Sequence, residues 1–272
     1  MTKRYYFMAG LPRSGSTLLS ALLNQNPQCH AGPSSPVFST MYAVENHFRT
    51  DPFFNGFPKI AQGNAIIKNL IDQYYTDTDR PIVIDKNRAW PGNIRFIEGY
   101  IGQRAKILCP VRDISEVIAS FIAMIHRHPY KEGFGRLNII DEQLVRGSIP
   151  LTDDDRCDFI AGPQGILGQS ISAIQEAISQ GLGDRLHFVE YKDLLSSPQK
   201  TMDAIYRFLD EKSFRHDFEN IENNQRENDF EVYGLEDMHE VRKKLGSSSV
   251  DPKKVLSPYV LSRCGSMNLW KG

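Results

Sequence analysis

Apolar and polar residues follow one another along the chain in blocks that fit alternating strands and helices. Short, dense apolar runs are typical of strands buried in a parallel sheet, and apolar residues that recur every three or four positions are typical of helices. The predicted strands span Arg4–Ala9, Ile82–Asp85, Lys106–Val111 and Leu186–Tyr191. The predicted helices span Thr17–Leu23, Lys59–Tyr75, Pro91–Gly102, Ile114–Ile125, Gln164–Gln180 and Pro198–Asp210. This alternation predicts an α/β fold with a central parallel β-sheet flanked by helices.

Length and composition add a prediction of domain organisation. The chain has 272 residues, of which 40% are hydrophobic, so it can bury one substantial core. We therefore interpret residues 1–272 as a single domain. The stretch from 129 to 160 is rich in glycine, proline and acidic residues and is interpreted as an inserted loop or lid. Residues 211–246 are highly charged and fit neither pattern.

Charge and cysteine usage narrow the class of protein. The 32 basic residues balance 33 acidic ones, so the chain has no overall positive field that would attract nucleic acid. No apolar run approaches the ~20 residues that span a bilayer, and the N-terminal apolar stretch is too short for a secretory signal. We expect a cytoplasmic protein with no membrane span and no nucleic-acid partner. The four cysteines form no C-x-x-C pair and are expected to be reduced, buried thiols.

The sequence GLPRSGST, residues 10–17, joins the first predicted strand to the first predicted helix. Gly10, Gly15 and Thr17 match the phosphate-loop pattern G-x-x-x-x-G-K-[ST], but Ser16 stands in place of its lysine. The backbone N–H groups of such a loop and the helix dipole together bind an anion. Further donors are the Arg13 guanidinium and the hydroxyls of Ser14, Ser16 and Thr17. The loop predicts a P-loop-type three-layer fold, and the missing lysine argues against transfer of a γ-phosphoryl group.

A second motif, CPVRDISEVIASF, covers residues 109–121. Arg112 follows the end of a predicted strand, and Ser120 comes about two helical turns later. Arg112 could therefore clamp a phosphate while Ser120 donates a further hydrogen bond. Taken alone, the motif fits a surface pair of Arg112 with Asp113 and a helix-packing hydroxyl better.

Together the two motifs resemble the cofactor signature of PAPS-dependent sulfotransferases, and the loop is most similar to that of the bacterial and tyrosylprotein enzymes. The resemblance implies that the loop binds the 5′-phosphosulfate of PAPS (3′-phosphoadenosine 5′-phosphosulfate). It also implies that Arg112 and Ser120 bind the 3′-phosphate, and that Arg13 takes the place of the kinase lysine. The implied reaction moves a sulfuryl group from PAPS to a hydroxyl or amine of an acceptor and requires no metal ion.

Other segments extend the resemblance. IVIDKNRAW is similar to a family strand whose following lysine contacts the sulfuryl group, which here is Lys86. FVEYKDLLSSP resembles a late strand and helix that place Tyr191 near the adenosine. The tail SSSVDPKKVLSPYVLSR resembles the segment that closes over the nucleotide, with Ser248 near the sulfuryl group and Arg263 near the 3′-phosphate. The resemblance thus implies catalytic roles for Arg13, Lys86 and Ser248, and nucleotide contacts from Arg13, Ser14, Gly15, Ser16, Thr17, Arg112, Ser120, Tyr191, Ser248 and Arg263.

One part of the family pattern is missing. The tyrosylprotein enzymes carry a glutamate as general base after the second strand, where this chain has Ser34 and Ser35. Candidates nearby in the sequence are His30, Glu45, His47 and Asp85, and the base stays unassigned. His126 and His128 lie two positions apart and share no helix face, so they predict no metal site.

Two alternatives stay open. Asp85 directly follows an apolar strand and could be a magnesium ligand, which keeps a P-loop small-molecule kinase or NTPase under consideration. The missing glutamate also leaves room for a nucleotide-binding module without catalysis, although the presence of Lys86 argues against it.

Overall fold

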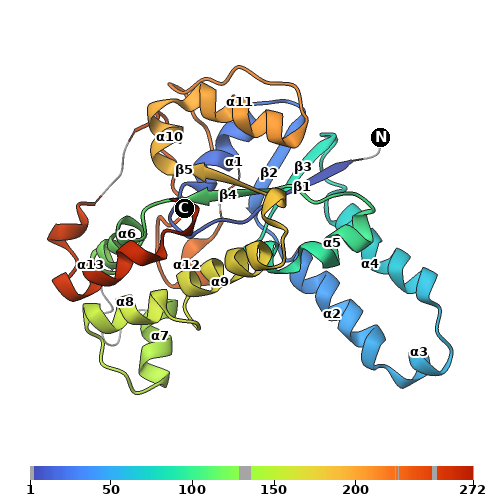
Figure 1. Ribbon diagram of the computed structural model, residues 1–272, viewed down its shortest axis with the longest axis horizontal. Coiled ribbons are helices and arrows are strands. Elements are labelled where there is room, and N and C mark those ends of the chain that lie inside the picture. Colours follow the sequence, from blue (N-terminus) through green and yellow to red (C-terminus); the bar gives the residue numbers. More distant parts are fainter. Residues whose placement is uncertain (1–2, 129–135, 224, 226, 247–249, 272) are drawn as a thin grey trace.

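The computed structural model of the protein describes residues 3–128, 136–223, 225, 227–246 and 250–271. A five-stranded, all-parallel sheet with the strand order β2-β3-β1-β4-β5 lies at its centre (Figure 1). The strands are β1 (Arg4–Met8), β2 (Cys29–Ser34), β3 (Ile82–Lys86), β4 (Ile107–Val111) and β5 (Leu186–Glu190). The predicted α/β class with a central parallel sheet is confirmed.

Helices cover both faces of the sheet and create two hydrophobic cores (Figure 1). Successive side chains of a strand point to opposite faces, so Tyr6 and Met8 of β1 pack against α1 and α11, whereas Tyr5 and Phe7 belong to the core under α4, α5, α6 and α9. The helices are α1 (Ser16–Asn24), α2 (Val37–Thr50), α3 (Pro52–Gly56), α4 (Ile60–Tyr74), α5 (Ile94–Ile101), α6 (Ile114–Arg127), α7 (Ile139–Arg146), α8 (Asp153–Ala161), α9 (Ile166–Ser179), α10 (Tyr191–Ser196), α11 (Pro198–Leu209), α12 (Asp229–Tyr233) and α13 (Pro258–Cys264).

The predicted strands and helices are all present, with small changes at their ends. The segment Pro91–Gly102 divides into a 3-10 turn, Pro91–Asn93, and helix α5. The predictions missed β2, because Gly32 and Pro33 interrupt its apolar run. They also missed α2, whose only fully buried residues are Val37 and Met41 among its described side chains, so its apolar stripe is short.

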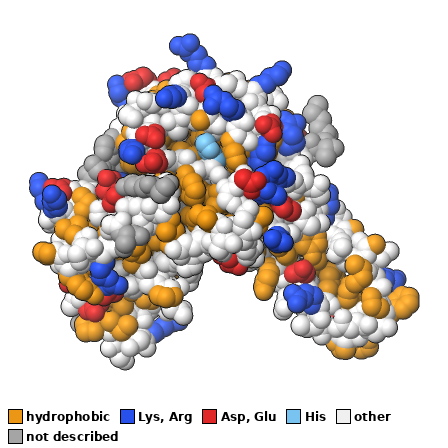
Figure 2. All heavy atoms as spheres, viewed as in Figure 1, with side chains coloured by type: hydrophobic (Ala, Val, Ile, Leu, Met, Phe, Trp, Pro, Cys, Tyr) orange, Lys and Arg blue, Asp and Glu red, His pale blue; other side chains and the backbone are white. Residues whose placement is uncertain are grey.

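Helices α2, α3 and α4 form an arm that projects from the sheet (Figure 1). Hydrophobic side chains gather on its surface (Figure 2). Among them, Phe53 is 87% exposed and Phe57 is 73% exposed.

The segment interpreted as an inserted lid carries α7 and the start of α8. Residues 129–135 of that segment lie outside the described part of the chain. Helix α8 packs against α6 and α9. None of the described helices is long and apolar enough to cross a membrane. The four cysteines are free and buried, as predicted from their spacing.

Gly10 provides a test of the packing between the loop and the sheet. A Cβ added there would lie 2.0 Å from the carbonyl oxygen of Pro110 on β4, so the loop or the strand would have to shift. We expect Gly10→Ala to lower the free energy of unfolding by about 2 kcal/mol or more, as overpacking against rigid backbone does. Urea unfolding measures the change.

Gly99 in α5 is the matched control, because a Cβ there would meet no atom within 4 Å. Gly99→Ala should raise the free energy of unfolding by up to about 1 kcal/mol through its better helix propensity. Equal effects of the two substitutions would contradict the assigned packing at Gly10.

Candidate functional site

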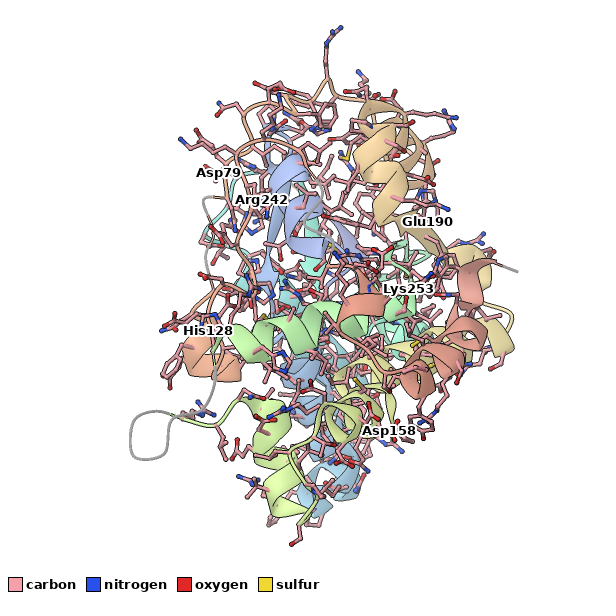
Figure 3. The ribbon with its side chains drawn as sticks, turned by 90° about the vertical axis from the view of Figure 1, so that its left-hand side faces the viewer. Asp79, His128, Asp158, Glu190, Arg242 and Lys253 are labelled. Atoms are coloured by element: carbon pink, nitrogen blue, oxygen red, sulfur yellow. The ribbon has the colours of Figure 1, made fainter. Side chains whose placement is uncertain are left out.

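A cleft of about 530 Å³ opens at the carboxyl edge of the sheet. Parallel strands β1, β3 and β4 end at this edge, so the segments that follow them meet there. The cleft is lined by the glycine loop, the end of β3, one face of α6, the start of α10 and residues 237–246 of the C-terminal segment. This last segment passes beside α1, where Figure 3 shows Arg242.

The glycine loop turns sharply into α1. Gly15 caps the helix with φ +86° and Arg13 has φ +58°, both in the left-handed region. The helical hydrogen bonds begin with the N–H of Leu19, which donates to the carbonyl of Gly15. The N–H groups of the first turn therefore have no partner within the helix, and they sit at its positive end beside the cleft. This arrangement is an anion cradle with Ser16 and Thr17 on its rim.

Arg13 and Ser120 come together in the cleft, although they are 107 positions apart. Nε of Arg13 donates to Oγ of Ser120 over 3.2 Å, and Nη1 donates to the carbonyl of Met238. Burial lowers the pKa of Arg13, and the nearby cations Arg127 and Arg112 lower it further. The cleft thus concentrates positive charge. Ser14 beside Arg13 is buried, and its hydroxyl donates to the carbonyl of Pro12 over 3.3 Å.

Arg112 lies at the end of β4 with its guanidinium under Tyr191. The centre of the guanidinium is 4.7 Å from the centroid of the Tyr191 ring, and Nε donates to Glu116 over 2.7 Å. Nη2 is buried and makes no hydrogen bond with any described residue. An unpaired buried guanidinium nitrogen is costly, so this atom is a donor suited to a bound anion.

Lys86 is the last residue of β3, and its ammonium makes only a long ion pair, with Glu227. Nζ is buried without a hydrogen bond to any described residue, and it lies 3.8 Å from Oε1 of Glu227. Burial lowers the pKa of Lys86 to about 8, and the carboxylate of Glu227 opposes this effect only in part. A second buried donor thus faces the same cleft.

Asp85, the neighbour of Lys86, points away from the cleft. Its carboxylate is fully buried and accepts hydrogen bonds from Tyr75 over 2.7 Å and from Trp90 over 2.6 Å, and also from Ser35. Burial raises the pKa of Asp85. Asp85 is therefore a structural group, and the magnesium-ligand hypothesis does not fit its position.

The remaining predicted residues lie elsewhere. Arg263 on α13 is not among the residues that line the cleft; it pairs with Asp158 and with the hydroxyl of Tyr259. Figure 3 shows Asp158 well apart from Arg242. The structure therefore does not bring Arg263 to the residues that line the cleft. Ser248 lies outside the described residues.

The base candidates chosen by sequence proximity do not line the cleft either. His30 lies on β2 with its ring against Tyr75, and Glu45 accepts a hydrogen bond from Tyr100 over 3.2 Å. His47 is exposed on the α2 arm. Glu45 and His47 do not line the cleft because helix α2 of the arm carries them away from the end of β2.

Several cleft residues were missed. Arg127 shares a face of α6 with Ser120, and helical spacing from Ser120 could have found it. Glu227, Asp229 and His239 gather beside Lys86 with ligand atoms within 4.8 Å of one another. They come from the highly charged stretch 211–246, where no periodic pattern indicates which residues turn inward. By residue type, the three could hold a metal ion.

Comparison with known proteins identifies the family. Residues 6–215 match the model described as "Sulfotransferase family". The chain belongs to the sulfotransferase family. The matched range contains the glycine loop, Lys86, Arg112 and Tyr191, but it ends before Glu227 and His239. The predicted sulfuryl transfer is thus confirmed at the level of the family, and the kinase alternative is not favoured.

Solved structures with a similar fold are distant from this sulfotransferase. The sulfotransferase domain from the curacin biosynthetic pathway is 17% identical, with a TM-score of 0.49 over 99% of this chain and 96% of that one. The domain from the Synechococcus PCC 7002 olefin synthase is 18% identical, with a TM-score of 0.44 over 79% and 75%. A sulfotransferase from Alicyclobacillus acidocaldarius is 14% identical, with a TM-score of 0.45 over 85% and 89%. No curated protein matches the sequence.

The lowered pKa of Lys86 in this sulfotransferase gives a direct prediction. The ammonium is favoured below a pKa of about 8 and is lost above it. A bound anion favours the charged form, so inorganic sulfate should raise the midpoint towards the ordinary 10.5. Carbon-13 NMR of the lysine side chains across a pH titration measures the midpoint, with the signal assigned through Lys86→Arg.

Lys68 serves as the reference within the same spectra, because it is half-exposed and pairs with Asp72 on the helix surface. Its NMR signal should not change when sulfate is added. A Lys86 midpoint near 10.5 that ignores sulfate would contradict the buried, anion-facing position of this ammonium.

Proposed function

We propose that this sulfotransferase moves a sulfuryl group from PAPS to a hydroxyl or amine of an acceptor molecule, without a metal ion and in the cytoplasm. One observation carries the proposal: Lys86 Nζ and Arg112 Nη2 are buried in one cleft and find no hydrogen-bond partner among the described residues. Each cation has one carboxylate neighbour, with Glu227 3.8 Å from Lys86 Nζ and Glu116 2.7 Å from Arg112 Nε. Lys86 Nζ and Arg112 Nη2 nevertheless keep buried donor capacity that a bound anion can satisfy. Their presence supports a ligand with more than one anionic group.

The chain's donors fit such a ligand. The N–H groups at the start of α1 and the Arg13 guanidinium would hold the 5′-phosphosulfate. Arg112 and Ser120 would hold the 3′-phosphate, and the Tyr191 ring would lie beside the adenosine. Arg13 donates to Ser120, so the two phosphate subsites share a hydrogen-bonded support.

Sulfuryl transfer requires charge stabilisation on the oxygen that leaves sulfur. PAPS supplies the sulfuryl group, and negative charge grows on its bridging oxygen as the bond to sulfur breaks. The Lys86 ammonium and the loop N–H groups are held in place before the reaction, so they can stabilise that charge without reorganisation. Contacts that strengthen as the charge develops are the ones that accelerate the reaction.

The chain offers little support for a nucleotide kinase. The P-loop lysine is absent, and the carboxylate of Asp85 accepts hydrogen bonds from Tyr75, Trp90 and Ser35. Similarity to the tyrosylprotein enzymes in particular, and the roles of Ser248 and Arg263, stay predictions.

Ligand preference tests the proposal. PAP, the product that keeps the 3′-phosphate, should bind in EDTA and more tightly than ADP, because Arg112 and Ser120 can add two or three charge-assisted hydrogen bonds. The gain should be about 2–4 kcal/mol by calorimetry. Tighter binding of ATP with Mg²⁺ than of PAP would reject the sulfotransferase proposal and favour a kinase.

Arg112→Ala tests the assignment of the 3′-phosphate. The affinity for PAP should fall by at least about tenfold, which corresponds to loss of one charge-assisted hydrogen bond. The affinity for AMP, which lacks the 3′-phosphate, should stay nearly the same. Arg146→Ala is the control, because Arg146 is exposed on α7, does not line the cleft and pairs with Glu142. Equal losses for PAP and AMP in Arg112→Ala would show that Arg112 contacts another part of the nucleotide.

A further inference from the structure

The reaction also needs a group that accepts the proton of the acceptor hydroxyl. At the end of β2, Ser34 and Ser35 offer no carboxylate or imidazole, and the Ser35 hydroxyl donates to Asp85. We propose that His239, oriented by Asp229, is the general base of this sulfotransferase. The proposal rests on the proposed function and assigns a role to a segment beyond the family-matched residues 6–215.

His239 is well placed for this role. It lines the cleft together with Lys86, Arg13 and the glycine loop. It also lines a small void of about 10 Å³ with Thr17, Lys86 and Glu227, which is room for about one water-sized group. An acceptor oxygen in this void would lie between the loop, the ammonium that stabilises the leaving group, and the imidazole.

Asp229 fixes the orientation of the imidazole. Oδ1 of Asp229 lies 2.5 Å from Nδ1 of His239, and Oδ2 accepts the backbone N–H of His239 over 2.9 Å. A carboxylate is an acceptor only, so Nδ1 must carry the proton, and Nε2 keeps its lone pair. Among the described residues, the side chain of His239 makes its hydrogen bond through Nδ1, and the other hydrogen bonds of this residue involve its backbone N–H and carbonyl. Nε2 is therefore left for the acceptor hydroxyl.

Glu227 is a positioning residue in this arrangement. Its Oε1 accepts the N–H of Ser34 over 2.5 Å and lies 3.8 Å from Lys86 Nζ, and its Oε2 lies 3.4 Å from Nδ1 of His239. Both oxygens are therefore occupied. Glu227 does not line the larger cleft, whereas His239 does. Glu227 links the imidazole to Lys86 and to the end of β2, and so holds the base beside the ammonium.

The transfer step is balanced. The acceptor oxygen forms a bond to sulfur while the bond from sulfur to the bridging oxygen breaks, and that electron pair leaves with PAP. The proton of the acceptor hydroxyl moves to Nε2 of His239, and it passes to solvent after PAP leaves. No other reactant is needed.

The groups that face the imidazole are Lys86 on β3, Glu227 before α12, and Asp229 and Tyr233 on α12. Both carboxylates approach the ring at Nδ1, so neither of them occupies Nε2.

Kinetics with acceptors of graded acidity test the role. PAP release from PAPS is measured for His239→Asn with phenol, 4-nitrophenol and water as acceptors, in EDTA. Asparagine keeps a donor towards Asp229 but has no basic nitrogen. The loss in kcat should be about 100-fold or more for phenol and much smaller for 4-nitrophenol, because a more acidic acceptor needs less help from a base. His47→Asn, on the exposed arm, is the matched control and should change neither value.

A second measurement does not depend on turnover. Nitrogen-15 NMR of labelled histidine should show His239 neutral at pH 7 with the proton on Nδ1, and Asp229→Asn should weaken this preference. A proton on Nε2, or the same loss of kcat for every phenol, would overturn the assignment of the base, as would activity lost in EDTA.

PAP affinity separates the two proposals. Wild-type protein that neither binds PAP nor releases it from PAPS contradicts the proposed function itself, whereas normal PAP binding and turnover by His239→Asn contradict only the base.

Discussion

The cleft depends on the close contact between the glycine loop and strand β4. The backbone of Gly10 packs against Pro110, and the N–H of Leu11 donates to the Pro110 carbonyl over 2.9 Å. This contact holds the loop over the end of β4, so that Arg13 reaches Ser120 and the carbonyl of Arg13 lies 3.5 Å from Nη1 of Arg112. Any side chain at position 10 would separate the loop from the strand and with it the two halves of the anion site.

The same cleft holds several cations at an energetic cost. Arg13 and Lys86 both have lowered pKa values because they are buried, and neighbouring cations add to the effect. A fold tolerates such groups when other interactions offset them, and an anionic ligand recovers part of the cost on binding. The cleft is therefore organised for a ligand that carries negative charge in more than one place, before any ligand arrives.

The C-terminal segment forms one wall of the cleft at the edge of the sheet. Met238 accepts a hydrogen bond from Arg13, and Glu227 accepts one from the end of β2, so the segment is joined to both sides of the cleft. Within this segment His239 pairs with two carboxylates, those of Asp229 and Glu227. Anion binding and the proposed proton transfer thus come from different parts of the chain, held together by a few polar contacts.

The sequence by itself determined four of the five strands, the glycine loop and the motifs around Arg13 and Arg112. Apolar runs indicate buried strands. The positions of Arg13 and Arg112 can be predicted from sequence because each residue lies within a few positions of the end of its strand. Only the tertiary structure decided that Asp85 faces the core and that Arg263 pairs with Asp158 away from the cleft. It also decided that His239 and Lys86 line the same small void. These outcomes depend on contacts between residues far apart in the chain, and residues 211–246 carry no periodic pattern from which such contacts could be predicted.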